Sequence, residues 1–279
     1  MENKLYPMTF KPIFREKIWG GQKIDKFGNV FPLLIKILDA EDWLSIQVHP
    51  DDALAKKRGL GGGKTEMWYI LDAEKDSKLI AGFSEKVNEN VYLRKIEDKK
   101  LPEIMNFESV EKEDVFYMPS GRVHALGPGV LLAEIQQTSD TTYRIYDWER
   151  LDDQGKGREL HLKEAMEAID FDLHDSYKTD YQAEENKTSP IINTPFFTTN
   201  VLWLKEHKSL QKDYSDLDSF VILLAIEGAF DYEDLNGKKG RIKAGESMLI
   251  PASLMGIKLL SASDCKLLEV YILPQKKND

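Results

Sequence analysis

The chain has 279 residues, of which 42% are hydrophobic and 31% are charged. This composition is typical of a soluble globular protein and excludes collagen-like, mucin-like and disordered chains. The 48 acidic residues outnumber the 38 basic ones, so the formal net charge is -10. A field of this sign repels nucleic acids and anionic membranes. An anionic ligand would therefore need a local basic pocket.

Cysteine content and the N-terminal segment indicate where the protein works. Cys265 is the single cysteine, so no intrachain disulfide can form. Residues 1–20 lack the apolar core and cleavage site of a secretion signal, and no window approaches the roughly 18 apolar residues of a membrane span. We expect a cytoplasmic protein with a small-molecule partner and no nucleic-acid or membrane partner; the sequence leaves its oligomeric state open.

Residues 31–50 predict two strands joined by a turn, the first almost continuously apolar and the second alternating. Side chains two positions apart lie on the same face of a strand. Ser45, Gln47 and His49 are therefore expected to project together, away from the apolar residues between them.

A short helix and a glycine-rich loop are predicted next. Asp52 is a suitable cap for a helix over 53–58, which Gly59 would end. Residues 59–63 form the loop.

The following segments are again rich in β-formers. Residues 64–71 predict a strand with Lys64 and Glu66 on one face. Later hairpins carry His124 on a short strand after a Pro-Ser-Gly turn and Glu134 on the next strand. Polar residues are thus expected on several β segments.

The chain divides into two β-rich parts. One amphipathic helix is predicted over 162–169 by apolar residues at i, i+3, i+4 and i+7. Residues 172–195 are polar and predict a surface connection between a domain over 1–171 and a second over 196–279. The two halves share a similar order of strands and turns, which indicates a weak internal repeat.

Four side chains on three β segments form the best candidate metal site: Gln47, His49, Glu66 and His124. Imidazoles, a carboxylate and an amide oxygen suit zinc with an open coordination position. The i, i+2 pair on one strand is a sensible chelate. The 17 residues from His49 to Glu66 and the 58 from there to His124 have no general meaning.

These residues lie within motifs of a known family. The segment from Pro119 to His124 resembles the second conserved motif of cupins. Three further segments, LSIQVHPDD from Leu44, KTEMWY from Lys64 and SDTTYR from Ser139, resemble type I mannose-6-phosphate isomerases in their short bacterial form. The similarity covers residues 10–171 in order, and the remainder resembles that family's second cupin module.

The resemblance implies a mainly β protein of two cupin-type jelly-roll barrels with a few short helices. It also implies a zinc enzyme that interconverts mannose 6-phosphate and fructose 6-phosphate, with one zinc per chain. Gln47, His49, Glu66 and His124 match the family's metal ligands. The helical insertion of longer family members is mostly missing, so its contacts cannot be transferred.

Further site residues are carried over by the same motifs. Arg144 matches the catalytic arginine and Lys64 an active-site lysine; Glu134 and Asp140 match acidic residues of the sugar pocket, and Ser45 a residue near the phosphate. Isomerisation through an enediol needs a base and positive charge against the enediolate. Glu134 is our preferred base, with a zinc-bound water as the alternative and Lys64 as electrophile or proton donor.

Alternative predictions differ in the class of protein. A non-catalytic or regulatory cupin that binds sugar phosphate could keep the metal ligands, but it would not require Lys64, Glu134 and Arg144. An iron-dependent oxygenase usually has two histidines and one carboxylate without an amide. In the second module, Gly256 stands where the first has its histidine, so that module is expected to bind no metal. Arg58, Arg122 and Lys64 are candidates for the basic pocket.

Overall fold

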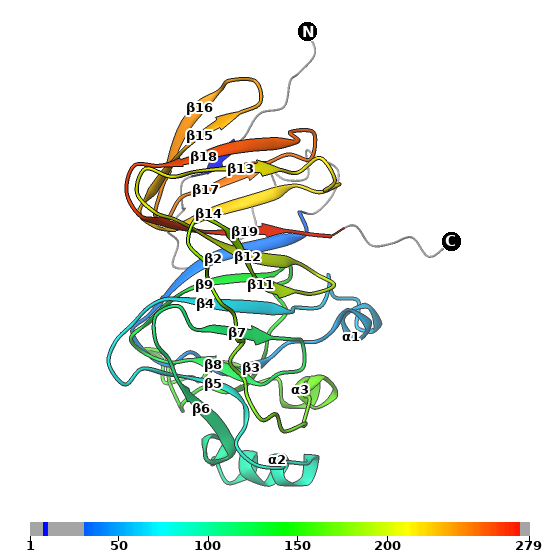
Figure 1. The fold of residues 1–279 in the computed structure, drawn as a ribbon. Coiled ribbons are helices and arrows are strands. Elements are labelled where there is room, and N and C mark those ends of the chain that lie inside the picture. Colours follow the sequence, from blue (N-terminus) through cyan, green and yellow to red (C-terminus); the bar gives the residue numbers. More distant parts are fainter. Residues whose placement is uncertain (1–7, 11–30, 274–279) are drawn as a thin grey trace. The chain divides into compact units, whose positions relative to one another are not determined.

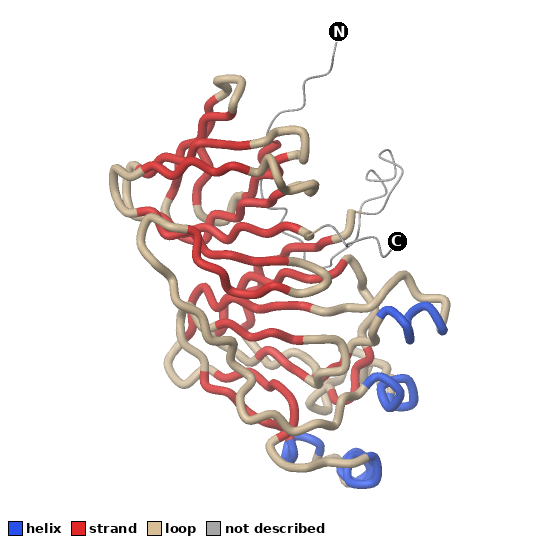
Figure 2. Tube along the Cα trace, turned by 45° about the vertical axis from the view of Figure 1, so that its right-hand side comes forward, coloured by secondary structure: helices blue, strands red, loops and turns tan. Residues whose placement is uncertain are grey.

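The computed structural model describes residues 8–10 and 31–273. Of the N-terminal residues 1–20, in which the sequence shows no secretion signal, residues 1–7 and 11–20 lie outside the described residues. The chain forms two compact units, residues 21–179 and residues 180–279 together with 1–20. We call them the N-terminal and C-terminal jelly rolls. Both are built mainly from antiparallel strands, and a few short helices occur in the described part of the N-terminal one (Figures 1 and 2), as the family resemblance implies.

Two sheets make up the N-terminal jelly roll. The four-stranded sheet has the order β2 (Leu33–Ala40), β9 (Val130–Gln137), β4 (Glu66–Ala73) and β7 (Val115–Met118). The five-stranded sheet has the order β10 (Tyr143–Tyr146), β3 (Ile46–Val48), β8 (His124–Leu126), β5 (Lys78–Phe83) and β6 (Met105–Ser109). The chain passes repeatedly from one sheet to the other, which is the strand order of a jelly roll.

The same order recurs in the C-terminal jelly roll. One sheet contains β1 (Met8–Phe10), β17 (Ser247–Ile250), β14 (Val221–Glu227), β19 (Cys265–Tyr271), β12 (Thr198–Leu204) and β11 (Thr188–Asn193). The other contains β13 (Ser209–Asp213), β18 (Gly256–Ser261), β15 (Ala229–Asp234) and β16 (Lys239–Lys243). Strands β12 to β19 therefore repeat the positions of β2 to β9, and the weak repeat in the sequence is a repeat of the fold.

The helices belong to the N-terminal jelly roll and are short: α1 (Asp52–Lys57), α2 (Glu89–Glu97), α3 (Leu162–Ala168) and a 3₁₀ turn (Leu101–Ile104). The predicted amphipathic helix is α3. No element was expected at α2, in which Tyr92 is the one fully buried residue, so its apolar pattern is weak.

The predicted cap of α1 is wrong by one residue. The Asp51 carboxylate accepts a hydrogen bond from the backbone N–H of Leu54 at 2.7 Å, because the cap precedes the first helical residue. Asp52 instead accepts from the backbone N–H of Gly63 at 2.8 Å. It thereby holds the end of the glycine-rich loop beside the first turn of the helix.

The connection predicted over 172–195 contains one regular element. Strand β11 (Thr188–Asn193) pairs with β12 inside the C-terminal jelly roll. Residues 172–187 before it contain no helix or strand, although Lys178 forms an isolated bridge to Phe116. Among the described residues, no helix has both the length and the apolar character needed to cross a membrane.

Strand alternation decides which side chains face the interior of the N-terminal jelly roll. Ile46 and Val48 of β3 pack in an apolar cluster with Tyr92 of α2 and Ala165 of α3. Gln47 lies between them on the strand and must point to the other side, between the two sheets. The apolar part of that interior includes Trp68, Phe116 and Leu132. Polar side chains that enter it are therefore surrounded by low-dielectric walls.

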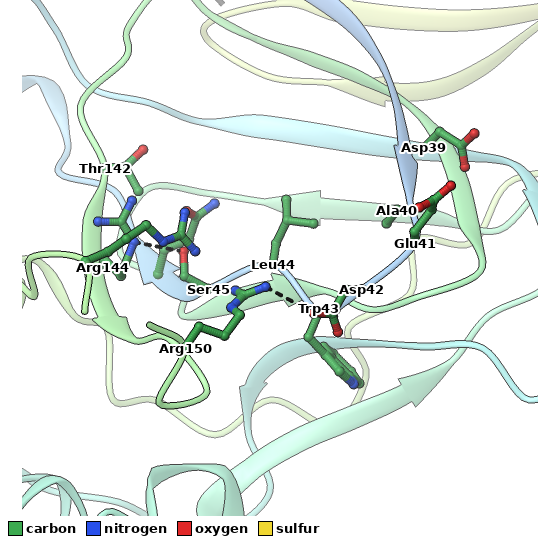
Figure 3. A pocket seen from close by; sticks show the side chains of 12 residues that line it. Asp39, Ala40, Glu41, Asp42, Trp43, Leu44, Ser45, Thr142, Arg144 and Arg150 are labelled. Atoms are coloured by element: carbon green, nitrogen blue, oxygen red, sulfur yellow. Dashed lines mark hydrogen bonds and ion pairs between the residues drawn. The ribbon is translucent and has the colours of Figure 1, made fainter. Parts of the chain in front are cut away.

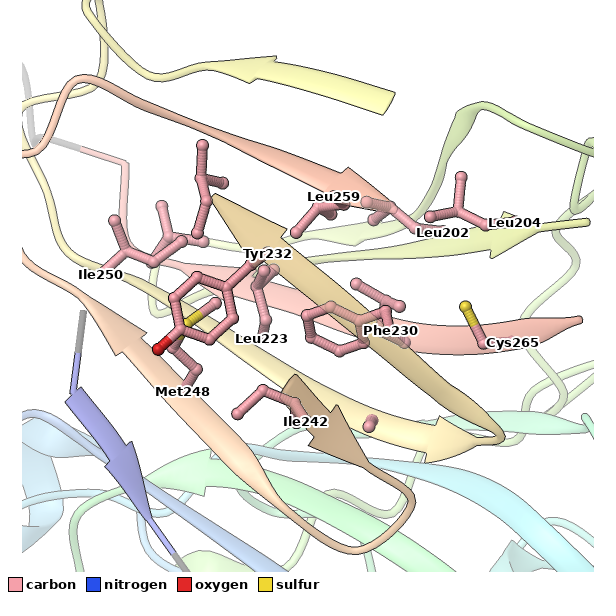
Figure 4. Close-up of a cluster of buried hydrophobic side chains, with 14 of the residues drawn as sticks. Leu202, Leu204, Leu223, Phe230, Tyr232, Ile242, Met248, Ile250, Leu259 and Cys265 are labelled. Carbon is pink, nitrogen blue, oxygen red and sulfur yellow. The ribbon is translucent and has the colours of Figure 1, made fainter. Parts of the chain in front are cut away.

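The interior of the C-terminal jelly roll is more apolar. Figure 4 shows its core, in which Phe230 and Tyr232 pack among aliphatic side chains from both sheets. Cys265 is part of this core, and burial raises the pKa of its thiol to about 11. A buried carboxylate, Glu269, accepts hydrogen bonds from Tyr214 at 2.6 Å and Asn200 at 2.8 Å.

Candidate metal centre and adjoining pocket

Three side chains converge inside the N-terminal jelly roll. His49 directly follows β3, Glu66 begins β4 and His124 begins β8, and each is at most 1% exposed. One ligand atom from each lies within 4.8 Å of the others. The Nε2 atoms of His49 and His124 lie 3.6 and 3.3 Å from the two Glu66 carboxylate oxygens. This geometry brings together three of the four predicted metal ligands.

Backbone hydrogen bonds set the tautomer of both imidazoles. His49 Nδ1 lies 2.9 Å from the carbonyl oxygen of Thr141, and His124 Nδ1 lies 2.9 Å from that of Arg122. A carbonyl oxygen only accepts, so each Nδ1 carries the proton and each Nε2 is unprotonated and carries a lone pair. Both lone pairs belong to the atoms nearest Glu66. The donor set therefore fits a metal ion.

The protonation state of these histidines also suits ligation. Burial, followed by the nearby Lys64 ammonium, lowers the pKa of His49 well below its usual value. Burial lowers the pKa of His124 too, although the Glu66 carboxylate opposes the shift. Metal ligation requires the neutral imidazole, so the site needs no deprotonation at neutral pH.

Gln47 is the fourth predicted ligand, and the sheet places it next to the other three. It pairs with His124 across β3 and β8, and its amide nitrogen lies 3.3 Å from His124 Nε2. Rotation of the amide about its last torsion would present the oxygen at the same place. Gln47 and His49, two positions apart, thus both lie next to His124.

Lys64 lies within the same cluster. Its ammonium contacts the Glu66 carboxylate and lies 3.0 Å from His49 Nε2. Burial alone would lower the pKa of Lys64, but Glu66 and Glu134 outweigh it and raise the pKa. Burial would likewise raise the pKa of Glu66, but Lys64 and His124 bring it below its usual value. The Glu66 carboxylate and the Nε2 atom of His49 therefore attract a cation, and in this structure the Lys64 ammonium occupies that place.

Glu134 projects from β9 into the same interior and is 4% exposed. Its carboxylate accepts a hydrogen bond from Trp68 Nε1 at 3.2 Å and contacts the ammonium of Lys36. The Lys36 ammonium also contacts the side-chain oxygen of Gln136. Sequence reasoning missed Lys36. The signal was present, since a lysine within a nearly continuous apolar strand must find a partner when it is buried.

An open pocket of ≈ 420 Å³ adjoins the cluster and shares Gln47 with it. Ser45 also lines this pocket, and Arg144 Nε donates to its hydroxyl at 3.3 Å. Figure 3 shows Arg144 at one end and Asp39 and Glu41 at the other, with Arg150 between them and ion-paired to Asp42 at 3.4 Å. The lining includes three arginines: Arg144, Arg150 and Arg158.

Other predicted residues lie elsewhere. Asp140 is exposed and is absent from the pocket lining, so the structure does not bring it to the cluster. Arg58 donates to the Tyr143 hydroxyl at 3.0 Å, and Arg122 to the carbonyl of Tyr117 at 2.9 Å. Neither lines this pocket. The arginines of the pocket are instead Arg144 of β10 and Arg150 and Arg158 of the loop that follows this edge strand and folds back toward β3.

The C-terminal jelly roll has different residues in the corresponding places. Gly256 begins β18 as His124 begins β8, and it pairs with Asp213 as His124 pairs with Gln47. Val221 begins β14 as Glu66 begins β4. The described residues of this unit thus offer no imidazole at the position of His124.

A two-sheet jelly roll that holds two histidines and a carboxylate around one point defines a metal-binding protein of the cupin type. Residues 13–81 match the family model described as phosphomannose isomerase type I, catalytic domain. Mannose-6-phosphate isomerase ManA of Bacillus subtilis (strain 168) is 34% identical to this chain, and the alignment covers 93% of this chain and 97% of the relative. The chain belongs to the type I mannose-6-phosphate isomerase family, as its motifs predict.

Two further comparisons agree with this membership. A mannose-6-phosphate isomerase of Streptococcus mutans is 40% identical over 195 residues, or 68% of this chain and 61% of the relative. The crystal structure of the Bacillus subtilis mannose 6-phosphate isomerase superposes with a TM-score of 0.77 and 31% identity, covering 90% of this chain and 80% of that chain. An alanine variant of phosphomannose isomerase from Salmonella typhimurium, with a TM-score of 0.66 and 15% identity, shares the fold.

Proposed function

We propose that this protein is a metal-dependent aldose–ketose isomerase that interconverts mannose 6-phosphate and fructose 6-phosphate. The observation that carries the proposal is the convergence of His49, Glu66 and His124 next to a pocket with a basic end. The names of the relatives support the same substrate.

Gln47, His49, Glu66 and His124 would hold one zinc ion per chain. Two neutral imidazoles with a carboxylate and an amide oxygen are a donor set that zinc accepts, and an open position suits a catalytic site. When bound, the ion would supply Lewis-acid polarisation of the sugar carbonyl. Lys64 would then share Glu66 with the metal, and its ammonium would be available to a substrate oxygen.

The chain's own residues supply the proton chemistry. Glu134 is the proposed base for the C2 proton, because its carboxylate is buried in the interior that also holds the metal cluster. Lys64 would protonate the substrate oxygens. Lys36 contacts Glu134 and would hold that carboxylate in place. Trp68 donates to both Glu134 and Glu66, at 3.2 and 3.1 Å, and so fixes the two carboxylates relative to one another.

Arg144 and the two other arginines of the pocket would bind the anionic parts of the substrate. The guanidinium of Arg144 is anchored by the Glu159 carbonyl at 2.9 Å and reaches Ser45 next to the metal cluster. From this position it could stabilise an enediolate or a phosphate. A sugar phosphate as substrate and a single buried thiol support a cytoplasmic location.

The test is a coupled assay of the purified protein with mannose 6-phosphate and with mannose, each before and after treatment with a chelator. We expect turnover of the phosphorylated sugar, poor use of mannose, loss of activity with chelator and recovery on addition of zinc. The KM should rise with ionic strength, because a few local cations bind the substrate in an acidic protein. Equal turnover of both sugars would refute the substrate. Binding of the sugar phosphate without turnover would support a binding protein instead.

A further inference from the structure

A buried carboxylate lies between two arginines of the pocket. Asp147 follows β10 and is 6% exposed. It accepts from Arg150 at 2.7 Å and from Nε of Arg158 at 2.6 Å, and a second nitrogen of Arg158 contacts it as well. One aspartate thus binds both guanidinium groups directly.

The basic end of the pocket gathers like charges. Burial lowers the pKa of Arg144, and the positive charges of Arg158 and Arg150 add to the shift while Asp147 opposes it. Burial alone would raise the pKa of the Asp147 carboxyl, but hydrogen bonds from Arg158 and Arg150 hold it below its usual range. Arg150 also pairs with the exposed Asp42 at 3.4 Å, so three cations face two carboxylates, and the remaining excess of positive charge suits an anionic ligand.

The backbone around Asp147 is held in an unusual conformation. Trp148 and Glu149 have φ values of 56° and 55°, in the left-handed region that larger side chains rarely adopt. Trp148 Nε1 donates to the carbonyl of Leu44 at 2.8 Å, and its ring packs on Trp43 at 5.1 Å between centroids. These contacts tie the turn after β10 to the segment that leads into β3 and fix the direction of the Asp147 side chain.

We propose that Asp147 is a positioning residue for binding of the substrate phosphate. It touches no substrate atom in this proposal. It spaces the guanidinium groups of Arg150 and Arg158, and the N–H groups that it does not use bind the phosphate oxygens. A guanidinium has five N–H donors, so two contacts to Asp147 leave donors for a second anion. The inference rests on the proposed sugar-phosphate isomerase function.

Asp147→Asn tests this role, because it keeps the size of the side chain and removes the charge. We expect KM for mannose 6-phosphate to rise about 10- to 100-fold, because this is the effect of losing one charge-assisted hydrogen bond. The kcat should stay within about threefold. The inhibition constant of inorganic phosphate should rise by a similar factor. Both changes concern binding of the phosphate and leave the reacting carbons untouched.

Asp152→Asn is the matched control in the same loop. Asp152 is exposed, and its carboxylate accepts from the backbone N–H groups of Gln154 and Lys156, at 2.9 Å each. If disorder of the loop were enough to weaken binding, this variant would reproduce the effect of Asp147→Asn. We expect it to leave KM and phosphate inhibition unchanged.

Arg158→Gln provides a second measurement if Asp147→Asn does not fold. As a single substitution it should raise both KM and the phosphate inhibition constant. In the double variant, KM should rise by less than the product of the two single-variant factors. The inference is overturned if Asp147→Asn and Arg158→Gln have the wild-type KM, or if Asp152→Asn matches Asp147→Asn. Absence of turnover in the wild-type protein would instead refute the proposed function.

Discussion

Replacing Glu134 by glutamine should remove the base and leave the fold intact. Glutamine has nearly the same shape and can still accept the hydrogen bond of Trp68 Nε1. Lys36 loses a charged partner but keeps its contact to the Gln136 oxygen, and its side chain is 15% exposed to water. The cost in folding stability should therefore be well below that of a fully buried unpaired charge.

The effect on catalysis should be much larger. A positioned general base contributes about 10²- to 10⁴-fold. Because Lys64 and a water molecule remain as weaker substitutes for the base, we expect the lower half of this range, about 10²- to 10³-fold in kcat. This equals roughly 3 to 4 kcal/mol in activation free energy. The KM should change little, since Glu134 lies away from the arginines of the pocket.

Proton exchange provides the decisive assay. With mannose 6-phosphate in deuterium oxide, the wild-type protein should exchange the C2 proton, which proton NMR follows directly, and Glu134→Gln should not. Glu233→Gln is the matched control, since Glu233 lies on β15 of the C-terminal jelly roll and pairs with Lys239 at 3.4 Å. Exchange at the wild-type rate in Glu134→Gln would refute the assignment and leave Lys64 or a water molecule as the base.

Three further predictions concern the metal, the arginine and pH. His124→Ala should lose the stoichiometric divalent ion in elemental analysis, whereas His174→Ala, an exposed residue of the connection, should retain it. Arg144→Lys should lower kcat by roughly two to three orders of magnitude with unchanged metal content, because it keeps the charge and loses the forked donor. The pKa of Asp147 is lower in the folded protein than in an unfolded chain, so its stabilisation is complete above about pH 4 and is lost as the pH falls further. The difference in unfolding temperature between the wild type and Asp147→Asn should accordingly stay constant above about pH 4 and shrink as the pH falls below it.

Local patterns in the sequence predicted much of the site. The period of two placed Gln47 with His49, and Lys64 with Glu66. In the structure Gln47 and His49 both lie next to His124, and Lys64 contacts Glu66. Motif resemblance linked these strands to His124, which their spacing alone does not do. The jelly-roll order supplies the reason, since it places β3, β4 and β8 around one interior although they are distant in sequence.

The basic end of the pocket could not be predicted in the same way. Arg150 and Arg158 lie in a loop, and their positions depend on a carboxylate and on left-handed residues that have no sequence period. Lys36 depends on the pairing of β2 with β9, which puts it opposite Glu134. The Lys36–Glu134 contact follows from the register between two strands, and the pattern of residues within one strand does not contain that register.

Gly256 makes it difficult to introduce a metal-binding histidine into the C-terminal jelly roll. A Cβ atom at this position would lie 2.7 Å from the backbone carbonyl of Lys212, so strands β13 and β18 pack more closely than a histidine would allow. Glu269 keeps a carboxylate in the neighbouring interior, but Tyr214 and Asn200 already occupy it. A designer who wished to build a second metal site there would have to separate two strands before adding any ligand. A single substitution of Gly256 by histidine is therefore blocked by the backbone of the neighbouring strand.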